Sequence, residues 1–129
     1  MAPEPAPVAR RILIVEDEPN ILLSLEFLLE GAGYEVASAR DGTKALVTAA
    51  SWHPDLVVLD IMLPLVNGFE VCRQLRASRE FDGVKILILT ARGREREVEK
   101  GLALGANAYL TKPFATRDLI ETTKRLLGA

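Results

Sequence analysis

The segment Ile12-Leu13-Ile14-Val15-Glu16-Asp17-Glu18-Pro19 joins a short apolar run directly to three acidic residues. Two similar apolar runs follow it, Leu56-Val57-Val58-Leu59 and Ile86-Leu87-Ile88-Leu89. Continuous apolar runs are typical of strands that are buried on both faces, as in a parallel sheet covered by helices. These runs therefore predict the three central strands of such a sheet, and weaker candidates near 34–39 and 108–111 predict strands at or near its edges.

Apolar residues at helical spacing lie after each expected strand. The stripes fall within 21–29, 45–50, 71–75, 98–102 and 119–127. Five successive strand-then-helix units with right-handed crossovers predict an α/β fold. We expect a doubly wound, five-stranded parallel sheet of order 2-1-3-4-5 flanked by five helices, the arrangement called flavodoxin-like.

The chain has 129 residues and a formal net charge of −2, which predicts one domain and no general affinity for nucleic acid or an anionic membrane. The single cysteine, Cys72, cannot form an internal disulfide, and no apolar run approaches the ~18 residues that would span a bilayer. We therefore expect a cytoplasmic protein. Alternating prolines over residues 1–9 predict a mobile tail, and residues 10–129 the folded domain.

Polar residues follow four of the five expected strands. Glu16 and Asp17 follow the first, Asp60 the third, Thr90 the fourth and Lys112 the fifth. The carboxyl ends of parallel strands meet at one edge of the sheet, where such folds bind their ligands. These side chains are therefore expected to share one site.

Each of these residues has a simpler interpretation when it is taken alone. Glu18 could equally be an acidic residue placed at a helix N-terminus, where the helix dipole favours it. Thr90 could be a turn residue and Lys112 a solvated charge. The combination is what favours a site.

A cluster of Glu16, Asp17 and Asp60 calls for a cation, since two carboxylates ~4 Å apart repel by about 4 kcal/mol at an effective dielectric constant near 20. Hard oxygen ligands with open positions suit Mg²⁺, which takes one or two carboxylates together with a phosphate oxygen. A nearby lysine and hydroxyl would bind the remaining phosphoryl oxygens. The pattern therefore predicts a carboxylate–metal–phosphoryl site.

The sequence resembles the receiver domain of bacterial two-component response regulators from about Arg11 to its C-terminus. Five segments in order and spacing carry the resemblance: Ile12-Leu13-Ile14-Val15-Glu16-Asp17-Glu18-Pro19, Leu59-Asp60-Ile61-Met62-Leu63-Pro64, Asn67-Gly68, Leu89-Thr90-Ala91-Arg92, and Gly105-Ala106-Asn107-Ala108-Tyr109-Leu110-Thr111-Lys112-Pro113-Phe114. The stretch 89–114 is most similar to receivers that carry a winged-helix DNA-binding output domain.

The resemblance implies that Asp60 accepts a phosphoryl group from a sensor histidine kinase or a histidine phosphotransfer protein. It implies that Glu16, Asp17 and Asp60, together with the backbone carbonyl of Met62, hold Mg²⁺. It further implies that Thr90 and Lys112 bind the phosphoryl group, and that the peptide bond between Lys112 and Pro113 is cis.

In the family, Thr90 and the aromatic residue corresponding to Tyr109 move on phosphorylation. That movement remodels the surface formed by the fourth helix, the fifth strand and the fifth helix, and a downstream protein would bind there. Met62 and Arg92 would flank the path of the attacking water, and we hypothesise that they set the lifetime of the phosphate. Unchanged autodephosphorylation after exchange of both would contradict this.

The chain departs from the family pattern at several places, and two of these concern the metal site and dimerisation. Glu16 stands where many members have Asp, and its longer side chain still reaches a metal directly or through water. Asn107 and Ala108 replace an acidic pair that helps the winged-helix regulators to dimerise. We therefore expect a monomer or a weak dimer.

The expected function is that of a single-domain response regulator whose output passes through a protein partner, without direct contact to nucleic acid or membrane. An alternative is the receiver portion of a longer DNA-binding transcription factor. A different class, a small phosphatase with an aspartyl-phosphate intermediate, needs a second carboxylate two residues after the nucleophile, where this chain has Met62. A phosphorylation-independent scaffold and a flavin-binding protein are less consistent with the site. We therefore expect no enzyme activity beyond the protein's own phosphorylation and dephosphorylation.

Overall fold

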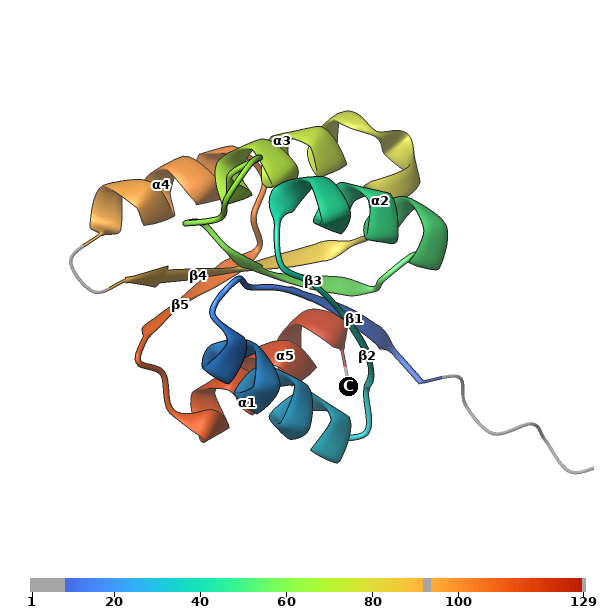
Figure 1. Cartoon of the computed structure of the whole chain (residues 1–129), viewed down its shortest axis with the longest axis vertical. Helices are drawn as coiled ribbons and strands as arrows, with labels where there is room; N and C mark the ends of the chain where they lie inside the picture. The colour runs from blue at the N-terminus through green and yellow to red at the C-terminus, as the bar shows by residue number, and fades with distance from the viewer. Residues whose placement is uncertain (1–8, 92–93, 129) are drawn as a thin grey trace, which may run out of the picture.

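The structure is a computed structural model that describes residues 9–91 and 94–128. A parallel sheet lies at its centre and helices cover both faces (Figure 1). Apart from Ala9, the tail expected over residues 1–9 lies outside the described residues, as does Arg92. No helix within these two described ranges is long and apolar enough to cross a membrane.

Five strands form the sheet in the order β2-β1-β3-β4-β5, as the sequence predicts. Their bounds are β1 Arg11–Val15, β2 Glu35–Ala39, β3 Leu56–Asp60, β4 Lys85–Ala91 and β5 Ala108–Lys112. Asp60 is in register with Leu89 of β4, and Ala91 of β4 with Lys112 of β5. The parallel register therefore brings the carboxyl ends of β3, β4 and β5 to one edge.

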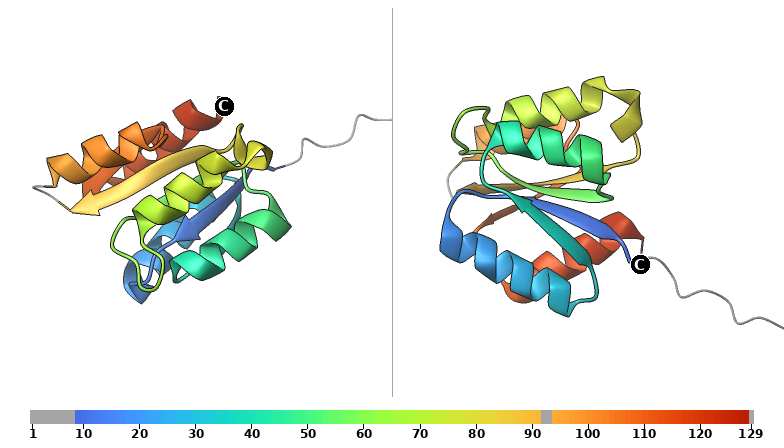
Figure 2. Two further views of the ribbon diagram at one scale, coloured as in Figure 1. Left: turned by 90° about the horizontal axis from the view of Figure 1, so that it is seen from above. Right: turned by 45° about the vertical axis from the view of Figure 1, so that its right-hand side comes forward.

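Five α-helices alternate with the strands: α1 Pro19–Gly31, α2 Gly42–Trp52, α3 Gly68–Ala77, α4 Glu95–Ala103 and α5 Thr116–Leu127. A short 3₁₀ helix, η1 at Arg79–Phe81, follows α3. Helices α1 and α5 cover one face of the sheet, and α2, α3 and α4 cover the other (Figures 1 and 2). This is the doubly wound arrangement expected from the sequence.

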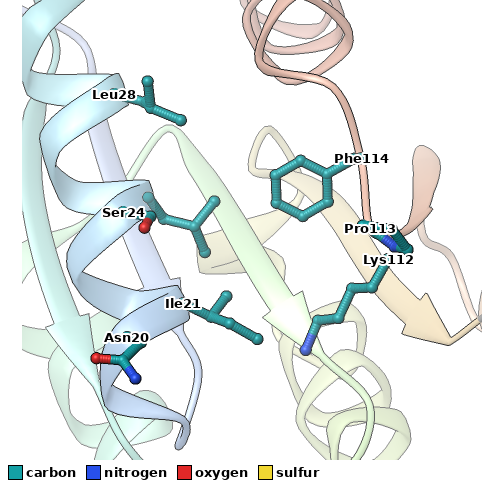
Figure 3. A pocket seen from close by; sticks show the side chains of 8 residues that line it. Asn20, Ile21, Ser24, Leu28, Lys112, Pro113 and Phe114 are labelled. Atoms are coloured by element: carbon teal, nitrogen blue, oxygen red, sulfur yellow. The ribbon is translucent and has the colours of Figure 1, made fainter.

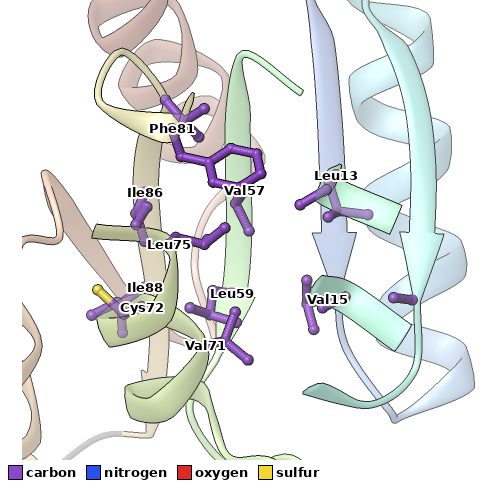
Figure 4. Packing of buried hydrophobic residues seen from close by; sticks show 14 of the residues in the cluster. Leu13, Val15, Val57, Leu59, Val71, Cys72, Leu75, Phe81, Ile86 and Ile88 are labelled. Atoms are coloured by element: carbon purple, nitrogen blue, oxygen red, sulfur yellow. The ribbon is translucent and has the colours of Figure 1, made fainter. Parts of the chain in front are cut away.

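The continuous apolar runs supply both faces of the sheet. Within β1, Leu13 and Val15 belong to the core under α2 and α3, whereas Ile12 and Ile14 belong to the core under α1 and α5. Figure 4 shows the first of these cores, where side chains of α3 pack on β3 and β4. Each fully buried Leu or Ile contributes about 1.5–3 kcal/mol to folding. Burial on both faces is thus the reason that these strands show no polar alternation.

The buried face of helix α4 differs from the face that the sequence predicts. The apolar stripe within 98–102 consists of Val98 and Leu102 and predicts that both face the sheet, but the Leu102 side chain is 41% exposed. The buried position is Gly101, where an added Cβ would lie 2.1 Å from Cδ1 of Ile88. Because a glycine carries no apolar side chain, the apolar pattern could not mark it as the inward position.

Asn107 has a role inside the domain. Its Oδ1 accepts hydrogen bonds from the Ile86 backbone N–H at 2.8 Å and from Arg76 Nη2 at 2.9 Å. The Arg76 guanidinium also donates to the carbonyls of Gly105 at 2.9 Å and Phe81 at 3.0 Å. The residue that replaces a family carboxylate therefore ties α3, η1 and β4 to the segment that leads into β5.

Candidate functional site

Five polar side chains share the carboxyl edge of the sheet. Glu16 and Asp17 follow β1, where the Glu16 backbone N–H donates to the Ala39 carbonyl at 3.1 Å. Asp60 and Lys112 are the last residues of β3 and β5, and Thr90 is the next-to-last residue of β4. The fold thus brings together every strand-end residue that the sequence placed in the site.

The three carboxylates form a tight cluster. One carboxylate oxygen from each of Glu16, Asp17 and Asp60 lies within 4.8 Å of the others. Glu16 is 1% exposed and Asp60 6% exposed, so water screens their charges poorly. An all-oxygen donor set with this negative charge fits a hard divalent cation such as Mg²⁺.

Lys112 forms ion pairs with two members of this cluster. Its Nζ donates to Glu16 Oε2 at 3.1 Å and to Asp60 Oδ2 at 3.3 Å. The Lys112 side chain is 24% exposed, so its charge is held partly out of water beside both carboxylates. Lys112 can therefore neutralise one negative charge of the site but not all three.

The pKa of the Glu16 carboxyl is raised in this site, mainly because the side chain is buried. Burial, and next the charge of Asp60, raise the pKa of the Glu16 carboxyl from 4.5 to about 7, while Lys112 opposes the rise. In the absence of a further cation, the ionised cluster is therefore costly. A bound divalent cation would favour the ionised form of Glu16 and relieve that cost.

The hydroxyl of Thr90 is buried, and its Oγ1 has no hydrogen-bond partner among the residues that the structure describes. Buried polar groups are nearly always paired, so such a hydroxyl in a functional site suggests that a ligand supplies its partner. The Asp60 carboxylate is also held by the backbone, because its Oδ1 accepts a hydrogen bond from the Met62 N–H at 3.1 Å.

The structure also describes the other residues of the expected site, with the exception of Arg92. The side chains of Met62 and Tyr109 are exposed, 62% and 47% respectively. The Lys112–Pro113 peptide bond is cis. Glu18 lies outside the cluster and caps α1, since its Oε2 accepts from the Ile21 backbone N–H at 2.8 Å. Arg92 is among the residues that the structure does not describe.

A pocket of about 440 Å³ adjoins the site, and the sequence analysis did not find it. Its lining comes from α1 and from the segment after β5: Asn20, Ile21, Ser24, Leu25, Leu28, Lys112, Pro113 and Phe114. Figure 3 shows Lys112 and Phe114 facing Ile21 of α1 across it. Lys112 therefore lines this pocket and also contacts Glu16 and Asp60 of the carboxylate cluster.

Comparisons with known proteins agree with this geometry. The family model "Response regulator receiver domain" matches residues 12–124. The alkaline phosphatase synthesis transcriptional regulatory protein PhoP of Bacillus subtilis is 45% identical over 118 residues, which cover 92% of this chain and 48% of that protein. The chain therefore spans about half the length of this curated relative.

Solved structures show the same fold over almost the whole chain. A putative response regulator from Chloroflexus aurantiacus has a TM-score of 0.91 at 35% identity, covering 95% of this chain and 100% of that one. The receiver domain of a sensor histidine kinase from Pseudomonas aeruginosa, crystallised with magnesium in its active-site cleft, has a TM-score of 0.86 at 33% identity, with coverage of 95% and 100%. With the family model matching residues 12–124, this chain belongs to the response regulator receiver domain family.

Proposed function

We propose that this chain is a phosphorylation switch in which Asp60 accepts a phosphoryl group from a phosphohistidine of a sensor histidine kinase or histidine phosphotransfer protein. The observation that carries the proposal is the arrangement around Asp60. Lys112 lies 3.3 Å from its carboxylate, and the buried Thr90 hydroxyl is unpaired within the described residues. A phosphoryl group on Asp60 would offer oxygens to both donors.

In the proposed transfer, a carboxylate oxygen of Asp60 attacks the phosphorus of the donor. The bond between phosphorus and the histidine nitrogen breaks, and its electron pair stays on the imidazole nitrogen, which takes up a proton. The product is an acyl phosphate on Asp60. The Lys112 ammonium and the Thr90 hydroxyl stabilise the phosphoryl oxygens by hydrogen bonds.

Glu16, Asp17 and Asp60, with the backbone carbonyl of Met62, would hold Mg²⁺, whose charge offsets that of the transferring phosphoryl group. The support for the three carboxylates is that one oxygen of each lies within 4.8 Å of the others. The magnesium in the active-site cleft of the Pseudomonas aeruginosa receiver domain adds to it.

The proposed output is a change of surface. Recruitment of the Thr90 hydroxyl to the phosphoryl group would let Tyr109, now 47% exposed, turn inward and alter the face formed by α4, β5 and α5. A downstream protein would bind the altered face, and Met62 with Arg92 would tune the lifetime of the phosphate. The protein would act as a monomer or weak dimer in the cytoplasm.

A second candidate function is that of the receiver portion of a longer DNA-binding regulator. It is favoured by the relative from Bacillus subtilis, a transcriptional regulatory protein of which this chain covers 48%. Either way, the site residues act only on the protein's own phosphoryl group. A phosphatase of the aspartyl-phosphate class is disfavoured because Met62 stands where its second carboxylate would be.

The test is incubation with acetyl phosphate and Mg²⁺, followed by intact mass spectrometry. We expect the parent to gain one acid-stable, base-labile phosphoryl group that Asp60→Asn does not gain. Asp82→Asn, at an exposed aspartate, is the matched control and should behave as the parent does. A parent that gains no phosphoryl group would contradict the proposal, and turnover of unrelated phosphoesters would favour an enzyme instead.

A further inference from the structure

The segment of residues 61–67 between β3 and α3, here called the acceptor loop, is closed at its base. The Ile61 carbonyl accepts hydrogen bonds from the backbone N–H groups of Leu63 and Gly68, both at 3.0 Å. The Leu63 and Val66 side chains pack against the core beneath α2 and α3. Leu65, by contrast, is 82% exposed and has a φ of 66°, in the left-handed region that side chains rarely adopt.

Gly42 of helix α2 packs closely against this loop. Gly42 is the first residue of α2 and is buried. A Cβ added to it would lie 1.8 Å from the Val66 carbonyl oxygen and 2.7 Å from the Val66 carbonyl carbon. The Val66 carbonyl therefore occupies the space of a side chain at position 42. Since both partners are backbone, no rotamer change could make room for a larger residue.

A second glycine holds the far end of the loop. A Cβ added to Gly68 would lie 2.5 Å from the Asp60 carbonyl oxygen and 2.6 Å from Ile61 Cα. Gly68 thus fixes the loop against the acceptor strand, and Gly42 fixes it against α2. Between these contacts the Met62 backbone N–H donates to Asp60 Oδ1 at 3.1 Å.

We propose that Gly42 is a positioning residue for the acceptor loop. Because Gly42 has no side chain, the Val66 carbonyl can pack against its Cα, and this contact holds the Met62 backbone beside Asp60. The part of this inference that concerns Mg²⁺ rests on the proposed function, because the Met62 carbonyl is one of the proposed ligands. If the Val66 backbone were displaced, the Met62 backbone would shift as well, because Gly68 holds the C-terminal end of the acceptor loop against β3.

The test compares Gly42→Ala with Gly31→Ala and Gly83→Ala. An added Cβ at either control position meets nothing within 4 Å, and neither control glycine has a positive φ. Mg²⁺ titration followed by calorimetry should give a dissociation constant ~10-fold higher for Gly42→Ala, as for other residues that orient metal ligands. Both controls should stay within about twofold of the parent.

Amide NMR reports the loop without any metal. Gly42→Ala should shift the Met62 and Val66 amide signals and speed exchange of the Gly68 amide, and the controls should not. A variant that binds Mg²⁺ as the parent does and leaves these amides unchanged would overturn the proposal. If the parent binds no Mg²⁺, the metal part of the proposed function fails, and the amide signals alone decide the role of Gly42.

A second pair of variants tests the proposal in the event that Gly42→Ala does not fold. Leu65→Gly frees the loop to shift, so the double variant Gly42→Ala/Leu65→Gly should fold. Its dissociation constant for Mg²⁺ should remain ~10-fold above that of Leu65→Gly alone. Equal affinities in this pair, with equal Met62 amide signals, would overturn the proposal.

Discussion

The ammonium nitrogen of Lys112 lies 3.3 Å from Oδ2 of Asp60, joining the last residue of β5 to the last residue of β3 across β4. The same nitrogen lies 3.1 Å from Oε2 of Glu16, which is 96 residues away in the chain. One cation thus faces two buried carboxylates, and this shortage of positive charge determines how the site responds to substitution, pH and metal.

Replacement of Lys112 by glutamine should destabilise the metal-free protein. At pH 8 the change leaves Glu16 and Asp60 without their cation, and removal of one partner of a largely buried ion pair costs about 3 kcal/mol. Urea denaturation with EDTA measures this loss. Added Mg²⁺ should recover part of it, because the metal supplies the missing positive charge.

Lys44→Gln is the matched control, because Lys44 is exposed on α2, and its effect should stay within about 0.5 kcal/mol. Equal stabilities of Lys112→Gln with and without Mg²⁺ would contradict the expected charge compensation.

The stability of the metal-free protein should depend on Glu16 between pH 4.5 and 7. The folded state raises the pKa of Glu16 from 4.5 to about 7, so in this window folded Glu16 keeps a proton that the unfolded chain has lost. Its contribution is fully present below pH 4.5 and is lost as the pH rises through 7.

The substitution Glu16→Gln isolates this contribution. Relative to Glu16→Gln, the parent should lose about 3 kcal/mol of unfolding free energy from pH 4 to pH 8, as followed by urea denaturation with EDTA. A constant difference between the two proteins over this range would show that the pKa of Glu16 is not raised. The variant should also bind Mg²⁺ more weakly at pH 8, since it loses a carboxylate ligand.

Replacement of Thr90 by valine should separate stability from signalling. Valine keeps the shape of threonine and removes the buried Oγ1, which has no partner within the described residues, so the unmodified protein should gain about 1 kcal/mol. Thermal unfolding measures this gain. Acetyl phosphate with Mg²⁺ should change the Tyr109 ring signals in NMR spectra of the parent but not of Thr90→Val.

Thr90→Ser keeps the hydroxyl and should retain the Tyr109 response, although loss of a buried methyl group lowers its stability by about 1 kcal/mol. A full change of the Tyr109 signals in Thr90→Val would show that the Thr90 hydroxyl is not required for the proposed switch.

Replacement of Leu65 by glycine should stabilise the protein by about 0.5–1 kcal/mol in urea denaturation. The left-handed backbone at φ 66° costs a residue with a side chain about 1–2 kcal/mol, and the greater freedom of glycine in the unfolded chain offsets part of the gain. Little burial is lost, because Leu65 is 82% exposed. Leu65→Ala keeps the Cβ and should give no gain, so equal stabilisation by alanine and glycine would argue against backbone strain.

The sequence predicted the sheet well because three strands each contain a continuous run of four apolar residues. Such runs are typical of strands buried on both faces, and placing them at the centre of the sheet with the two weaker strands at its edges gives the order 2-1-3-4-5. The same logic predicted that Glu16, Asp17, Asp60, Thr90 and Lys112 would meet at one edge.

Other features of the structure could not be predicted because they correspond to no hydropathy pattern in the sequence. Gly101 of α4 and Gly42 of α2 are buried through close approaches to Ile88 and Val66, and a residue without a side chain carries no hydropathy signal. The pocket beside Lys112 and the hydrogen bonds of Arg76 to the segment before β5 likewise join residues far apart in sequence.

By itself, the sequence determined the fold class, the order of the strands and the edge at which the chemistry lies. These follow from local hydropathy and from the handedness of the chain. Only the tertiary structure decided that Lys112 pairs with Glu16 as well as Asp60, that burial raises the pKa of Glu16, and that Gly42 supports the acceptor loop. Each depends on distances and solvent exclusion between distant segments, and those arise only when the sheet and its helices are packed together.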